Sequence, residues 1–170
     1  MSEAKGISTP KEPSYLKLEG EDDLLPNNEK YRQAVGALLY ISTMTRPDIT
    51  TAVGILCRYV EKPRQRDWNA VKRLLRYLKE TQDVNLKLSA TGDLELIGYV
   101  DADWAGDSHD RKSTSGYLFK VGESLISWSS RKQVSVALSS RDAEYVSATY
   151  VSQEVNWLRQ LMDDLGTPST

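Results

Sequence analysis

Residues 84–107 read VNLKLSATGDLELIGYVDADWAGD, and this stretch decides which fold the sequence predicts. Upstream of it, apolar residues recur every three or four positions, as they do in amphipathic helices. Within it they alternate with polar residues or form short runs, which indicates strands at 85–88 and 94–100 joined by the turn residues 90–93. The change of period near Asp83 therefore predicts a helical part followed by a part built on a sheet.

The sheet is expected to continue downstream and to be covered by a helix. Two further strands are predicted at 115–121 and 125–130, where aromatic and β-branched residues are frequent. The longest helical pattern of the chain then covers 139–165, with Ser139 as its expected N-cap and Gly166 as its stop. This order of elements predicts an α+β fold with a small mixed sheet and one long helix.

Three helices are predicted upstream of the sheet. The first begins at Glu29, and the second begins at Pro47 and continues to about Val60, since Pro63 ends it. The third starts with Asp67 as its N-cap and ends at Lys79. Their apolar positions lie three or four residues apart, so each helix is expected to bury one face. The residues on these faces are Tyr31, Val35, Leu38, Leu39 and the polar Ser42 in the first helix, Ile49, Val53, Leu56, Cys57 and Val60 in the second, and Trp68, Val71, Leu74, Leu75 and Leu78 in the third.

The segment before the first helix differs in composition from the rest of the chain. Residues 1–30 hold four Lys and seven Asp or Glu, together with Pro10, Pro13 and Pro26. A charged composition interrupted by proline is typical of an extended or flexible segment without a packed core of its own. We therefore expect residues 1–28 to form a flexible leader.

The third predicted helix and its approach are basic. Across residues 58–80, eight Lys or Arg stand against three acids. A charge run of this kind is by default an ordinary solvated helix face. The alternative is a surface that follows the phosphate backbone of a nucleic acid. The residues that would form such a surface are Arg64, Arg66, Lys72, Arg73 and Arg76.

Carboxylates gather at the end of the stretch 84–107. Asp101 ends the predicted strand, Asp103 follows two residues later, and Asp107 four residues after that. Carboxylates at a strand end can point together at a hard cation, and Mg²⁺ prefers a few such oxygens together with water and substrate phosphate. Asp and Gly are also the usual residues of turns, so the same residues fit a capped strand without a metal.

Glu144 is a further carboxylate with an unusual place in the pattern. It lies in the first turns of the long helix, on a face shared with Val151, Val155 and Leu158, which are expected to point inward. An acid on a core-facing side needs a partner, and a metal ion would be one. The alternative is that Glu144 only favours the positive N-terminal end of the helix, a contribution of about 0.3–1 kcal/mol.

The composition argues against several other kinds of site. The chain has 170 residues, a net charge of −2, one cysteine and one histidine. Because Cys57 is the one cysteine, an internal disulfide framework and a cysteine-based zinc site are excluded. Because His109 is the one histidine, a histidine-dependent triad or metal cluster is not expected. No apolar stretch is long enough to span a membrane, and residues 1–10 lack the apolar core of a signal peptide. We therefore expect a cytoplasmic or nuclear protein with no membrane partner.

Several further segments are informative because of the order in which they occur. The strand with Asp101 is followed by STSGYLF at 113–119, ISWSSRKQ at 126–133 and SSRDAEY at 139–145. This order resembles the ribonuclease H family, and specifically its copia-type retrotransposon branch. YRQAVGALLYISTMTRPDITTAV at 31–53 and WNAVKRLLRYLKETQDVNLKL at 68–88 are similar to the stretch that such polyproteins place between polymerase and nuclease.

This resemblance implies a division of the chain into three parts. Residues 1–28 would be the flexible leader, and 29–82 a helical connection segment at the end of the reverse transcriptase region. Residues 83–166 would be the N-terminal half of a ribonuclease H-like domain. The implied fold class is α+β, with an incomplete ribonuclease H-like mixed sheet and one long helix after the helical segment.

The resemblance also implies a site. In this family two divalent ions held by acidic residues activate water for phosphodiester cleavage. Asp101 and Glu144 match the first two acids as catalytic residues and Mg²⁺ ligands, with Asp103 as a helper, and an RNA–DNA hybrid is the implied partner. The family's third acid lies on a later strand, and a further acidic or histidine element lies beyond it; neither occurs before Thr170. We therefore expect a remnant of a copia-type polyprotein, inactive without the remaining polyprotein segments.

An interaction protein derived from such a fragment is the alternative. Arg73-Leu74-Leu75-Arg76 spells RxLR, a pattern associated with secreted effectors of oomycetes. So short a pattern is common by chance, and here Leu74 and Leu75 are expected in the core of a helix. An upstream signal peptide would favour the secreted effector, whereas flanking polyprotein sequence would favour the remnant.

Overall fold

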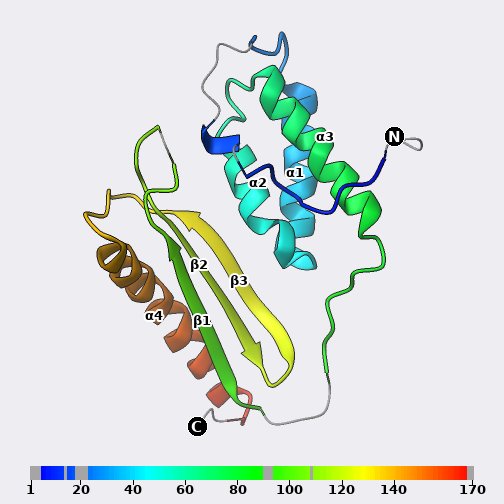
Figure 1. The fold of residues 1–170 in the computed structure, drawn as a ribbon. Helices are drawn as coiled ribbons and strands as arrows, with labels where there is room; N and C mark the ends of the chain where they lie inside the picture. The colour runs from blue at the N-terminus through cyan, green and yellow to red at the C-terminus, as the bar shows by residue number, and fades with distance from the viewer. Residues whose placement is uncertain (1–4, 14, 18–22, 90–93, 108, 168–170) are drawn as a thin grey trace. The chain divides into compact units, whose positions relative to one another are not determined.

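The computed structural model describes residues 5–13, 15–17, 23–89, 94–107 and 109–167, and it divides the chain into two compact units. Unit 1 is Met1–Asn85 and unit 2 is Leu86–Thr170, so the division lies close to the change of period near Asp83. The elements of unit 1 are η1 (Tyr15–Lys17), α1 (Glu29–Met44), η2 (Pro47–Ile49), α2 (Thr50–Cys57) and α3 (Gln65–Glu80). Those of unit 2 are β1 (Leu96–Asp103), β2 (Thr114–Val121), β3 (Ser124–Lys132) and α4 (Ser140–Asp164) (Figure 1).

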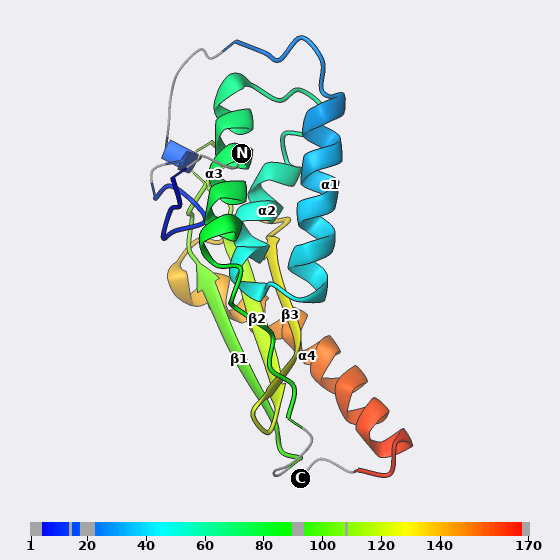
Figure 2. The ribbon, with the colours of Figure 1, turned by 90° about the vertical axis from the view of Figure 1, so that its right-hand side faces the viewer.

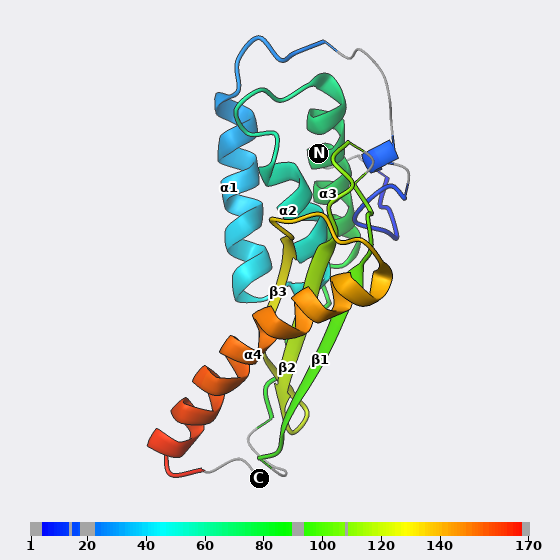
Figure 3. The same cartoon turned by 90° about the vertical axis from the view of Figure 1, so that its left-hand side faces the viewer.

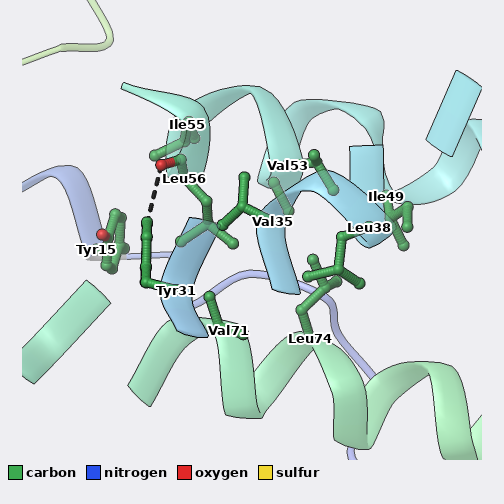
Figure 4. Close-up of a cluster of buried hydrophobic side chains, with 11 residues drawn as sticks. Tyr15, Tyr31, Val35, Leu38, Ile49, Val53, Ile55, Leu56, Val71 and Leu74 are labelled. Carbon is green, nitrogen blue, oxygen red and sulfur yellow. Dashed lines mark hydrogen bonds between the residues drawn. The ribbon is translucent and has the colours of Figure 1, made fainter. Parts of the chain in front are cut away.

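The helices of unit 1 enclose one apolar core, shown in Figure 4. The periodic positions of the sequence supply it, because one face of each helix carries apolar side chains at three- and four-residue spacing. Tyr31 of α1 also donates its hydroxyl hydrogen to the Leu56 carbonyl of α2 at 2.9 Å, which links the two helices. The buried residues of this core are Tyr15, Tyr31, Val35, Leu38, Ile49, Ala52, Val53, Ile55, Leu56, Val71 and Leu74.

Two predicted details of α1 and α2 were wrong. Leu39 is 45% exposed, because Leu38 and not Leu39 falls on the buried side of α1. α2 ends at Cys57 and not near Val60. The chain turns directly after it, and the Arg58 N–H donates to the Ile55 carbonyl at 3.1 Å. Pro47 does open a helical turn, as its fixed backbone angle favours.

The start of α3 also differs from the prediction. The N-cap is Arg64, so Asp67 is the third residue of the helix and not its cap. Asp67 nevertheless provides a hydrogen-bond acceptor at the start of the helix, since its carboxylate accepts a hydrogen bond from the Arg64 backbone N–H at 2.7 Å. An aspartate in the first turn fits either position by sequence, and only the backbone decides between them.

The described leader residues are attached to α3, as the dark blue trace in Figure 2 shows. Tyr15 is buried, and its hydroxyl donates to the carboxylate of Asp67 at 2.5 Å. Leu24 forms an isolated antiparallel bridge with Arg64 at the start of the helix. The sequence did not predict this attachment, because a single buried tyrosine in a charged segment produces no periodic pattern.

The sheet of unit 2 has the order β1-β2-β3 and is antiparallel throughout the described residues. It was predicted to be mixed, but a parallel pair needs a crossover of about a dozen residues or more. The connections 104–113 and 122–123 are shorter than that. The predicted strand at 85–88 is wrong: residues 84–89 have no regular structure, since no strand pairs with them. β1 starts two residues later than predicted and continues through Asp103.

The long helix α4 crosses one face of this sheet, as Figure 3 shows. It begins after Ser139, whose side chain accepts a hydrogen bond from the Asp142 N–H, and it stops before Gly166, which has a φ of 72°. Phe119 of β2 is buried against Val151 and Leu158 of α4. The α+β class is confirmed. Within the part of the chain that the structure describes, no helix has the length and apolar character needed to cross a membrane.

Candidate functional site

Strand β1 carries Asp101 and Asp103, the first two of the three aspartates that the sequence singles out. Asp101 is paired with Gly116 of β2, and its side chain is exposed. Gly98 faces the Phe119 ring beneath α4, since a Cβ added there would lie 2.4 Å from that ring. Side chains alternate between the two faces of a strand. Asp101 and Asp103 therefore point to the sheet face away from α4.

Helix α4 is hydrogen-bonded to the backbone of β1 at Asp101. The hydroxyl of Ser147, which is fully buried, donates to the Asp101 carbonyl oxygen at 3.1 Å. Glu144 lies about one helical turn before Ser147. Its side chain is exposed, whereas Ala143 and Ser147 are buried. Glu144 is thus not core-facing, although the sequence pattern predicted that it would be.

The structure brings the backbone segments of Asp101 and Glu144 together, but it does not place their acidic side chains in one cluster. The Ser147 hydrogen bond connects the start of α4 with the backbone of Asp101, while the Asp101 carboxylate lies on the other face. In the described part of the chain, no group of three or more His, Cys, Asp or Glu side chains is arranged to hold a metal. A two-ion site needs ligands on both sides of the scissile phosphate. The described residues therefore do not fit such a Mg²⁺ site on their own.

Asp107, the last aspartate of the motif, has a structural role. It is 5% exposed and accepts hydrogen bonds from the Lys132 ammonium and from the His109 N–H. Lys132 also pairs with Asp110 at 2.8 Å. Burial tends to raise the pKa of Asp107, but the hydrogen bonds from Lys132 and His109 hold the pKa below its usual value. The negative charge of the Asp107 carboxylate is therefore compensated by a lysine 25 residues away. No local sequence pattern predicts this contact.

A buried polar cluster fixes the start of α4 on the hairpin. The Nε2 of Gln133, which is 6% exposed, donates to Ser115 Oγ of β2 and to the Ala143 carbonyl of α4, both at 2.9 Å. The Gln133 backbone N–H donates to the Ser113 carbonyl at 2.8 Å. Among the described residues, the Gln133 Oε1 atom has no hydrogen-bond partner. A glutamine just after a strand has no distinguishing sequence signal, and it was not predicted as a functional residue.

The five predicted basic residues are in or next to α3, and the side chains of two of them donate hydrogen bonds to the leader. Arg73 donates to the Thr9 hydroxyl at 2.8 Å, and Arg76 donates to the Lys5 carbonyl at 2.7 Å. Lys72, which directly precedes Arg73, is exposed. The surface is therefore less open than the sequence suggested. Arg66, Lys72, Arg73 and Arg76 line a common pocket, and Arg64 does not line it.

Comparison with known proteins shows extensive similarity to transposon polyproteins. The chain is 43% identical over 166 residues to the Retrovirus-related Pol polyprotein from transposon RE2 of Arabidopsis thaliana, which covers 98% of this chain and 11% of that protein. It is 42% identical over 173 residues to the Pol polyprotein from transposon TNT 1-94 of Nicotiana tabacum, with 98% and 13% covered. The chain thus spans only about a tenth of the length of these polyproteins.

A third relative is short. The chain is 48% identical over 131 residues to the Secreted RxLR effector protein 161 of Plasmopara viticola, which covers 77% of this chain and 92% of that protein. No family model matches the chain. No solved structure matches it either.

The polyprotein similarity extends over nearly the whole chain, through the helices of unit 1 and the sheet and long helix of unit 2. The resemblance that the ordered motifs indicated is therefore confirmed. The chain belongs to the family of copia-type retrotransposon Pol polyproteins and corresponds to a fragment of one.

Proposed function

We propose that the chain carries one part of a ribonuclease H-like site and does not cleave nucleic acid on its own. Asp101 and Glu144 are the acids that it would contribute, with Asp103 next to them. The supporting observation is the hydrogen bond from Ser147 to the Asp101 carbonyl, which holds the first turns of α4 against the acidic end of β1. The remaining polyprotein segments would supply the other acids.

Mg²⁺ is the ion that the completed site would hold. When bound, such ions activate water and stabilise the leaving oxygen. Asp101 and Glu144 are both exposed, so the described residues leave each carboxylate open to further polyprotein segments. Asp163 and Asp164 at the end of α4 are too distant to take part, because the 19 residues from Glu144 to Asp163 span roughly 28 Å of helix.

The partner in this proposal is an RNA–DNA hybrid, as the family resemblance implies. Arg64, Arg66 and Lys72 would contact phosphates, together with Arg73 and Arg76 if the leader leaves them accessible. Each phosphate contact releases bound counterions. Weak hybrid binding by the chain should therefore fall steeply as the salt concentration rises.

The test is cleavage of a labelled RNA–DNA hybrid by the purified full chain with Mg²⁺ or Mn²⁺. We expect no cleavage above that of the variants Asp101→Asn and Glu144→Gln, which serve as matched controls. Metal-dependent cleavage that disappears in either variant would contradict the proposal, because the described acids would then be sufficient. Circular dichroism of all three proteins checks that the fold is the same.

A secreted effector is the second candidate, and the similarity to the Plasmopara viticola protein favours it. The RxLR letters Arg73-Leu74-Leu75-Arg76 lie within α3, and Leu74 is fully buried in the core. A receptor could not bind all four side chains without unfolding this helix. Sequencing the transcript upstream of Met1 separates the two candidates: a signal peptide would favour the effector, and polyprotein sequence in frame would favour the remnant.

A further inference from the structure

Unit 1 contains a pocket between the described leader residues and the helices α2 and α3. Its volume is about 590 Å³, within the range of roughly 300–1,000 Å³ that is common for small-molecule sites. Ile55 and Leu56 of α2, Ala70 of α3 and Ile7 of the leader give it apolar walls. The pocket belongs to unit 1, whereas Asp101 and Glu144 belong to unit 2, so the inference does not rest on the proposed nuclease role.

The lining of this pocket is also strongly cationic. Five Lys or Arg line it, against Glu12 as the one acid among its lining residues. The Arg73 guanidinium donates to Thr9 through one terminal nitrogen, but its Nε is buried with no hydrogen-bond partner among the described residues. A buried donor without an acceptor is unfavourable, so an acceptor placed here would be stabilised. The five cations are Lys11, Arg66, Lys72, Arg73 and Arg76.

The two properties together define the chemistry of a ligand. A guanidinium binds phosphate oxygens through paired hydrogen bonds, and an ammonium adds a mobile point charge. Several cations with one acid favour a doubly charged group over a singly charged one. The apolar walls favour a ligand with a hydrophobic or aromatic body, since burying that surface is favourable.

We propose that this pocket binds a phosphate monoester that carries an apolar or aromatic body. The phosphate lies at Arg73 and Lys72, and the body lies over Ile55, Leu56 and Ala70. A nucleoside monophosphate and an alkyl phosphate share this chemistry. Four of its cations are also among the residues proposed above to contact a hybrid, but the pocket differs in the ligand it takes, a single phosphate group together with its substituent.

Calorimetric titration of the full chain with four probes tests the proposal. Adenosine monophosphate and octyl phosphate contain both parts of the ligand, inorganic phosphate lacks the body, and adenosine lacks the charge. We expect one of the two monoesters to bind roughly tenfold or more tightly than both inorganic phosphate and adenosine. The monoester that binds more tightly shows whether the apolar body of the ligand is a nucleoside or an alkyl chain. Equal affinity for inorganic phosphate and both monoesters, or no binding of either monoester, would overturn the proposal.

Two pairs of variants place the binding in the pocket. Arg73→Gln should weaken the tighter monoester roughly tenfold or more, whereas Arg32→Gln on the exposed side of α1 should not change its affinity. Ala70→Leu fills the pocket without removing a charge and should also weaken binding, unlike Ala37→Leu on the exposed side of α1. Thermal unfolding of each variant confirms folding. Unchanged affinity in a folded Ala70→Leu protein would contradict the site.

Discussion

The two units bury their apolar residues to very different extents. Unit 1 has a cluster of eleven buried residues from its helices and leader, whereas the cluster between sheet and helix in unit 2 contains three: Phe119, Val151 and Leu158. Large apolar side chains stay exposed on α4 and directly after it, with Trp157 at 58% and the C-cap residue Leu165 at 69%. Apolar burial is the dominant favourable term in folding. We therefore expect unit 1 to be the more stable of the two.

The exposed residues of unit 2 are arranged in a way that explains the difference. Trp157 and Leu161 of α4 and the C-cap residue Leu165 lie four residues apart and so form one stripe. β1 is an edge strand of the described sheet. An open edge and an exposed apolar stripe are features that folded domains usually cover. This agrees with the proposal that unit 2 is one part of a larger nuclease domain.

The largest expected effect is in the core of unit 1. Leu74 of α3 is fully buried, so Leu74→Ala should lower the free energy of unfolding by about 2–5 kcal/mol through lost burial and a residual cavity. Val151→Ala in unit 2 should cost roughly 1.5 kcal/mol, because less apolar volume is removed from a smaller cluster. Calorimetric unfolding of both variants measures the two costs. A greater cost for Val151→Ala would reverse the proposed ranking of the units.

A smaller effect is expected where the leader joins unit 1. Burial and the hydrogen bond to Asp67 raise the pKa of Tyr15 well above its usual value, so the phenol stays protonated and remains a donor. Tyr15→Phe removes that donor and leaves an Asp67 oxygen poorly satisfied, at a cost of about 1–3 kcal/mol. Tyr40→Phe is the control, because Tyr40 is 67% exposed. Equal stability of the two variants in urea unfolding would show that the hydrogen bond from Tyr15 to Asp67 adds nothing to the stability of unit 1.

The smallest effect concerns the contact between α4 and β1. Ser147→Ala removes the hydrogen bond to the Asp101 carbonyl and should destabilise unit 2 by about 0.5–1.5 kcal/mol. Ser152→Ala is the matched control, since Ser152 is exposed and bonds only within its own helix, to the Thr149 carbonyl. Amide exchange rates of β1, measured for both variants, report the change. If Ser147→Ala leaves these rates like those of Ser152→Ala, the contact does not hold Asp101 in place.

The sequence predicted the elements that depend on local periodicity. The stripe that begins at Tyr31 and the hairpin around Gly122 are both present, because each pattern is complete within a few residues. The predicted strand at 85–88 failed, since a strand also needs a partner that the chain does not place beside it. The compensation of Asp107 by Lys132 and the orientation of Asp101 depend on register and distant contacts. These features become visible only in the folded chain.

The most direct test of the difference between the units is native-state hydrogen exchange of the full chain, followed by mass spectrometry. Exchange reports the free energy of local and global opening for each segment. We predict that amides of α1 and α3 exchange roughly tenfold or more slowly than those of β1 and of the C-terminal half of α4. Equal protection in both units, or slower exchange in unit 2, would contradict the view that unit 1 has a complete core and unit 2 an incomplete one.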